Sequence, residues 1–132
     1  MKLSVMFVIA AILLTLIGIA SILVPVVAPA ALVGAGVLDA TGAFNVMLSG
    51  VGQLSLGVIA WLVRNAEASK TRDSVVVGYT FLFALWAAIS LYGVTLSEMP
   101  SHNISWLPAL IQALLAVGFF MAGKASMSTS AK

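Results

Sequence analysis

The sequence has no cysteine, little charge and a single histidine, and each of these shortages excludes a class of function. Without cysteine the chain has no disulfide, no thiolate metal site and no thiol redox chemistry. Charged residues make up 8% of the chain, compared with about 25% in a typical soluble domain. The net charge of +2 gives no basic face that would bind nucleic acid. The single histidine, His102, excludes a haem held by two histidines of one chain.

Acidic residues are too sparse around His102 for a metal site. Glu98 lies four positions before His102, and Asp39 is the only other acidic residue expected on the same side of the protein. A zinc site needs three or four protein ligands. We therefore predict no metal site, and we assign no cofactor.

Apolar residues dominate what remains, at 62% of 132 residues. A soluble chain of this length could not bury so much apolar surface in one core, so lipid must be its main solvent. About 20 apolar residues cross the hydrocarbon layer, and backbone groups in lipid must pair within the segment, so each apolar run must be a helix. The predicted fold is an all-α, integral membrane four-helix bundle that forms a single domain over residues 1–132. Its spans are residues 3–24, 43–63, 74–96 and 105–122.

Polar residues and prolines predict where the spans begin and end. Pro25 is expected to end the first helix, and residues 25–39 either kink and extend that helix or lie on the outer surface. The triplet Ala28-Pro29-Ala30 resembles a signal-peptide cleavage site, but the apolar run before it is too long, so we expect an uncleaved first helix. The small, polar residues 126–132 are expected to be mobile. The predicted caps are Asp39 or Thr41 for the second helix, Asp73 or Ser74 for the third, and Ser105 for the fourth, with Pro108 in its first turn.

The basic residues predict the orientation of the chain in the membrane. They are Lys2, Arg64, Lys70, Arg72, Lys124 and Lys132. Four spans place the N-terminal tip, the connection between the second and third helices, and the C-terminal tail on one side, and all six basic residues fall there. The positive-inside rule makes that side cytoplasmic, so both termini are predicted to be cytoplasmic.

Part of the chain resembles small bacterial four-span membrane proteins of unknown function, loosely of the DoxX-like kind. The resemblance rests on the pattern Gly50-x-Gly52-x4-Gly57-x3-Trp61-Leu62-x-Arg64, on the polar loop of residues 66–72, and on Trp106 at the start of the fourth span. It implies a four-helix membrane fold in a bacterial plasma membrane. Many members of that group carry an arginine early in the second helix, but residues 44–47 contain none here. Any role of that arginine is therefore not carried over.

Polar side chains recur near the middle of the predicted spans. Asn45, Ser49 and Gln53 repeat every four positions on one face of the second helix. On the third helix a spacing of three and four residues aligns Tyr79, Phe83, Trp86, Ser90 and Gly93. Thr15, Gln53, Trp86 and Gln112 lie near the centres of their spans, at similar depth. Together with the stripe residues we predict a mid-membrane polar layer, whose candidate members are Thr15, Asn45, Ser49, Gln53, Trp86, Ser90 and Gln112. Two interpretations of this layer remain open: hydrogen bonds between helices, or a pocket for a lipid-like or quinone-like molecule.

No ionisable residue lies inside the predicted spans, which argues against a proton-coupled exporter and against an ion path lined by charged side chains. No nucleophile and general base can be paired, so we do not expect an enzyme. The leading hypothesis is a structural or accessory membrane subunit that contacts lipid and either self-associates or joins a larger membrane complex. Small residues at Thr80, Ala84 and Ala88, and at Ala109 and Ala113, favour close helix packing. The alternative is a four-helix binder or carrier of an apolar molecule.

Overall fold

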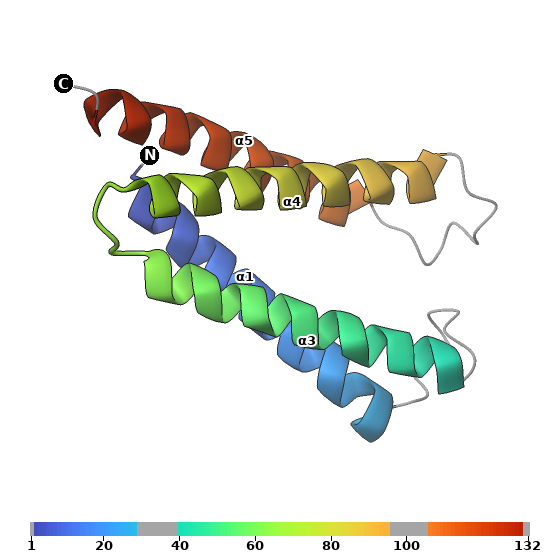
Figure 1. Ribbon diagram of the computed structural model, residues 1–132. Coiled ribbons are helices and arrows are strands. Elements are labelled where there is room, and N and C mark those ends of the chain that lie inside the picture. The colour runs from blue at the N-terminus through green and yellow to red at the C-terminus, as the bar shows by residue number, and fades with distance from the viewer. Residues whose placement is uncertain (1, 29–39, 96–105, 131–132) are drawn as a thin grey trace. The chain divides into compact units, whose positions relative to one another are not determined.

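The computed structural model describes residues 2–28, 40–95 and 106–130, and it contains four long helices (Figure 1). These helices are α1 (Leu3–Val27), α3 (Ala40–Val63), α4 (Lys70–Thr95) and α5 (Trp106–Ser130). The described residues include no β-strand. The prediction of an all-α protein with four helices is confirmed. Each helix is long and apolar enough to cross a membrane.

The end of α1 differs from the prediction. Pro25 does not end the helix but lies inside it, and the helix continues to Val27, where the N–H of Ala28 still donates to the carbonyl of Val24 at 3.0 Å. A proline inside a helix lacks the N–H that would bond four residues back, and its ring crowds the carbonyl there. Here only Val26 and Val27 follow it in the helix, so the disturbance falls in the last turn of α1. Of the two predicted courses for residues 25–39, the helical extension holds as far as Val27, and residues 29–39 lie outside the described part of the chain.

Ser69, and neither predicted residue, caps the start of α4. The hydroxyl of Ser69 accepts a hydrogen bond from the backbone N–H of Arg72 at 3.2 Å, which is the geometry of an N-cap residue. Asp73 and Ser74, the predicted caps, lie inside the helix, where the carboxylate of Asp73 in the first turn interacts favourably with the helix dipole. The sequence prediction failed because short polar residues are common both at the N-cap and in the first turn of a helix.

Predictions for the other helix starts have mixed outcomes. Thr41 is not a cap, because α3 already begins at Ala40. Pro108 lies in the first turn of α5, as predicted, where its missing N–H would have had no helical partner. The remaining predicted caps, Asp39 and Ser105, lie outside the described residues.

The C-terminal segment forms more helix than the sequence predicted. The fourth span was expected to end near residue 122 and to be followed by a mobile tail, but α5 continues through Ser130. Within this extension, the hydroxyl of Ser126 accepts a hydrogen bond from the guanidinium of Arg72 in α4. This contact ties the two helices together beyond the predicted end of the span.

The chain divides into two compact units, each built on a pair of helices. The unit of Phe7–Val63 contains α3 and nearly all of α1. Gly18 of α1 lies against Gly50 and Leu54 of α3, and Thr15, earlier in α1, lies against Gly57, later in α3. Positions that ascend in one helix while they descend in the other show that the two helices are antiparallel.

The second unit contains residues Met1–Met6 and Arg64–Lys132, and it is built on α4 and α5. A ring contact joins Tyr79 to Phe119, and a hydrogen bond joins Ser90, later in α4, to Gln112, earlier in α5. These two helices are therefore antiparallel as well (Figure 1). The organisation of residues 1–132 as a single domain stays a prediction.

Candidate functional site

The seam between α4 and α5 is filled by aromatic rings over the half nearer the start of α4. The ring of Phe119 stacks on Tyr79 with centroids 5.4 Å apart and on Phe83 with centroids 5.9 Å apart. Trp86 meets Phe83 edge-on at 6.2 Å. Tyr79, Phe83 and Phe119 are all nearly fully buried. The predicted alignment of Tyr79, Phe83 and Trp86 at a spacing of three and four residues thus describes the face of α4 that packs on α5.

A hydrogen bond joins the same two helices one turn beyond the aromatic rings. The hydroxyl of Ser90 donates to Oε1 of Gln112 at 2.8 Å. Both residues belong to the predicted polar layer. A hydrogen bond of this kind between membrane helices contributes about 0.6–2 kcal/mol. Of the two interpretations of the polar layer, this pair fits the first, a hydrogen bond between helices.

The polar stripe of α3 behaves differently. Nε2 of Gln53 donates to the hydroxyl of Ser49 at 3.1 Å, within the same helix. Oε1 of Gln53 is buried, and no donor among the described residues reaches it. Asn45, one turn before Ser49, is exposed. Gln53 is therefore the one member of this stripe that carries a buried, unsatisfied acceptor.

Thr15, the predicted member of the layer from α1, lies in the contact between α1 and α3. A Cβ added to Gly57 would lie 2.5 Å from the Thr15 hydroxyl oxygen. Beside this contact a groove of about 360 Å³ runs along the same helix pair and ends at Trp61. The residues that line it are Ala11, Ile12, Thr15, Leu16, Gly57, Val58 and Trp61.

The predicted layer is thus divided between the two units. Ser90 pairs with Gln112 in one unit, and Ser49 pairs with Gln53 in the other. Trp86 lies beside the first pair in sequence and contacts Phe83. The gathering of all seven residues in one layer stays a prediction.

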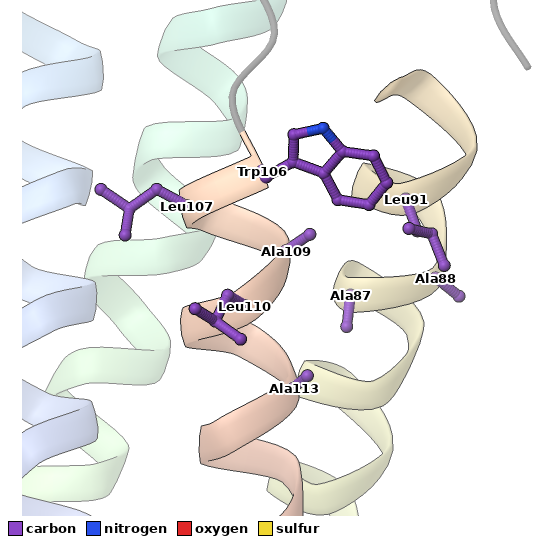
Figure 2. A pocket seen from close by; sticks show the side chains of 8 residues that line it. All are labelled: Ala87, Ala88, Leu91, Trp106, Leu107, Ala109, Leu110 and Ala113. Atoms are coloured by element: carbon purple, nitrogen blue, oxygen red, sulfur yellow. The ribbon is translucent and has the colours of Figure 1, made fainter. Parts of the chain in front are cut away.

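A second groove lies between α4 and α5, towards the start of α5. It has a volume of about 540 Å³. Figure 2 shows the indole of Trp106 extending from α5 towards Leu91 of α4, with Ala109 and Ala113 turned towards α4. We call this feature the α4–α5 groove, and it is lined by Ala87, Ala88, Leu91, Trp106, Leu107, Ala109, Leu110 and Ala113. Small residues predicted to bring helices close together, Ala88 and Ala113, here line an open space instead.

Arg72 has a structural role that the sequence did not predict, because it was considered there only as one of the basic residues that set the orientation. Its side chain is 12% exposed, and it lies 3.5 Å from the carboxylate of Asp73. The guanidinium donates to the carbonyl of Ala66 at 3.4 Å and to the hydroxyl of Ser126. It thus joins the α3–α4 connection, the start of α4 and the end of α5. The only sequence signal was a basic residue in the first turn of a helix, a position where the helix dipole disfavours positive charge.

The predictions for metal sites concern residues outside the described part of the chain, namely Asp39, Glu98 and His102. Within the described ranges no three histidine or acidic residues come together. Comparison with protein-family models, with curated proteins and with solved structures finds no match to this chain. The resemblance to DoxX-like proteins therefore stays a prediction.

Proposed function

We propose that this chain is a four-span protein of a bacterial plasma membrane, with both termini in the cytoplasm. The four helices have the length and apolarity that a membrane span requires. Large apolar side chains such as Leu62, Phe81 and Met121 are exposed on their surfaces, where lipid would cover them. The orientation is supported by Arg64 directly after α3 and by Lys70 and Arg72 in the first turn of α4, since the other two connections hold no basic residue.

Within that membrane we propose a non-catalytic structural or accessory role. The observation that carries this proposal is where the small and polar side chains of the helices lie. Gly18, Gly50 and Gly57 bring α1 and α3 into backbone contact, and Ser90 bonds Gln112 across α4 and α5. These residues act in packing, and many large apolar side chains, such as Phe81 and Ile89, remain exposed on the helices. Exposed apolar side chains of this kind suit contact with other membrane helices, either of a second copy or of a larger complex.

Site-specific photo-crosslinking tests this role in the intact membrane. A photoreactive amino acid replaces Phe81 or Ile89, each 64% exposed on α4, or Phe119, which is fully buried, as the control. We expect a discrete adduct, with a second copy or with one partner protein, from at least one exposed position and none from Phe119. Adducts with lipid alone at both exposed positions, together with purification as a monomer, would refute the accessory role.

One observation supports the alternative function, a binder or carrier of an apolar molecule. The buried Oε1 of Gln53 has no donor within the described chain, and a hydroxyl or N–H group of a bound molecule could supply one. The test is mass spectrometry of the molecules that co-purify with the wild-type chain and with Gln53→Leu. A lipid- or quinone-like molecule present in the first and absent in the second would favour this function over the structural one.

A further inference from the structure

We propose that the α4–α5 groove binds one acyl chain of a membrane phospholipid. The inference rests on the membrane insertion proposed above, but it requires neither the accessory role nor the carrier role. The groove is also a different place from the predicted polar layer, since its lining includes none of the seven residues of that layer.

The chemistry of the lining selects an apolar occupant. Of the eight described residues that line the groove, seven are alanine or leucine, and the eighth is Trp106, whose side chain has the indole nitrogen as its one polar atom. A ligand with polar groups along its length would bury them unpaired, which is costly. The volume, about 540 Å³, lies within the range of about 300–1,000 Å³ that small-molecule pockets have. The occupant must therefore be uncharged and apolar over the length of the groove.

The dimensions of the groove suit a single extended chain. Its lining on α5 runs from Trp106 to Ala113, which is about 10 Å along a helix axis. One leaflet of the hydrocarbon layer is about 15 Å thick. Tryptophan favours the boundary with the headgroups, so Trp106 marks the end of the groove at which the lipid headgroup would lie. An acyl chain with its headgroup beside Trp106 would lie in the groove for about two-thirds of its length.

The seam itself explains why this space remains open. Aromatic rings fill the half of the seam nearer the start of α4, but in the other half Ala87, Ala109 and Ala113 project only a methyl group each (Figure 2). An empty space would cost the surrounding side chains their dispersion contacts. Leu91 and Leu110 at the groove are exposed, at 45% and 58%, so the space is continuous with the surface that faces lipid. A chain can therefore enter from the bilayer without any unfolding.

A helix from a second copy is a poorer occupant. The groove offers about two helical turns of contact, from Trp106 to Ala113. A stable protein interface buries about 800 Å² on each partner, which two turns of one groove cannot provide. This comparison favours an acyl chain over a protein segment.

Two exposed alanines of α4, one turn apart, make a matched test. Ala88 lines the groove, whereas Ala84 is exposed outside it. The wild-type chain, Ala88→Phe, Ala113→Phe and the control Ala84→Phe are reconstituted in vesicles of phosphatidylethanolamine and phosphatidylglycerol with brominated acyl chains. Native mass spectrometry after transfer to detergent then counts the phospholipids that each variant retains. We expect the wild-type chain and Ala84→Phe to retain one more phospholipid than the two variants that fill the groove.

Equal retention by all four proteins would overturn the inference, and so would a change from dimer to monomer on filling the groove, because the occupant would then be a second copy. Circular dichroism checks that each variant folds, and Ala88→Leu replaces a phenylalanine variant that does not. Bromine quenching of Trp86, in a variant with phenylalanine in place of Trp61 and Trp106, tests insertion separately in the same vesicles. If Trp86 is not quenched, the proposed function fails; if Trp86 is quenched and retention is equal, only the groove proposal fails.

Discussion

Gly18 of α1 and Gly50 of α3 face each other so closely that a Cβ atom on either residue would lie 2.8 Å from the carbonyl oxygen of the other. The Cα hydrogen that takes the place of each Cβ therefore points at a carbonyl group of the opposite helix, as in the weak Cα–H···O contacts of closely packed helices. Gly57 makes a third close contact one heptad after Gly50. The backbones of α1 and α3, and not large side chains, set the distance between these helices.

Replacing Gly18 by alanine should destabilise the protein. The new Cβ would lie 2.7 Å from the backbone nitrogen of Leu54, and a backbone atom cannot turn aside as a flexible side chain can. The helices must therefore separate, and overpacking of this kind costs about 1–3 kcal/mol. The loss is measured by SDS titration of the protein in mild detergent, followed by circular dichroism.

Gly52→Ala provides the matched control for Gly18→Ala. A Cβ at Gly52 meets no described atom within 4 Å, so this variant should be as stable as the wild type, or more stable by up to about 1 kcal/mol because alanine favours a helix. Equal destabilisation by both substitutions would contradict the packing of α1 on α3.

These glycines illustrate how far the sequence could predict the fold. Gly50 and Gly57 are seven positions apart, so the helical period places them on one face of α3 and Gly52 on another. Gly50 and Gly57 touch α1 whereas Gly52 faces open space, because one face of α3 packs on α1, and no local pattern encodes which face that is. The face of α4 was easier to predict, because rings as large as Tyr79 and Phe83 at a spacing of three and four residues leave one way to be buried.

The same distinction between local and distant causes applies to the candidate site. The pair of Ser90 and Gln112 was predictable, because the position of a residue within its predicted span gives its level along neighbouring helices. The hydrogen bond from Arg72 to Ser126 was not predictable, because the two residues lie 54 positions apart. Small polar residues alone predicted a mobile tail.

Replacing Arg72 by methionine should loosen the end of α5. Methionine keeps the apolar stem but removes the donors to Ala66 and Ser126, and hydrogen bonds from a charged group are worth about 1.5–3 kcal/mol. We expect faster amide hydrogen exchange in residues 124–130. Lys70→Met removes the same charge from the same end of α4, where the side chain is exposed, and should leave the exchange unchanged. If both variants exchange alike, charge and not the hydrogen bonds of Arg72 holds the helix.

The proposed topology can be tested with reporters fused at two sites. All six basic residues fall on the side that we assign to the cytoplasm. A reporter after Lys132 should therefore be active in the cytoplasm, and one inserted near Glu98 should be active outside. An external signal from Lys132 or a cytoplasmic one from Glu98 would reverse or abolish the proposed orientation.

The three tryptophans should report three depths. Trp61 and Trp106, 49% and 59% exposed, lie at opposite ends of their helices, whereas Trp86 is partly buried near the middle of α4. Because indoles favour the headgroup boundary, shallow quenchers should reduce the fluorescence of Trp61 and Trp106 more than that of Trp86. Single-tryptophan variants, with phenylalanine at the other two positions, allow each to be measured. Equal quenching at all three positions would show that the spans are placed wrongly.

Gln53 and Gln112 both lie near the middle of their helices, but we expect them to differ in what they contribute to the stability of the protein. Gln112→Leu removes the acceptor of the Ser90 hydroxyl and should cost about 0.6–2 kcal/mol, the worth of a hydrogen bond between membrane helices. Gln53→Leu removes a buried Oε1 that has no donor among the described residues. Its other bond is to Ser49 in the same helix, whose hydroxyl can bond instead to a backbone carbonyl one turn earlier. Gln53→Leu should therefore leave stability unchanged or raise it.

Ser90→Ala completes a double-mutant cycle with Gln112→Leu, and the coupling energy isolates the bond between α4 and α5. Unfolding of all four proteins, measured alongside Gln53→Leu in the same detergent, ranks the two glutamines directly. If Gln53→Leu proves the more destabilising of the two, its Oε1 must accept a hydrogen bond in the folded protein. The reason is that a buried acceptor is stabilising only when a donor reaches it. If a co-purifying small molecule is lost in Gln53→Leu, that molecule supplies the donor. If the co-purifying molecules are unchanged, the donor is water or another part of the chain.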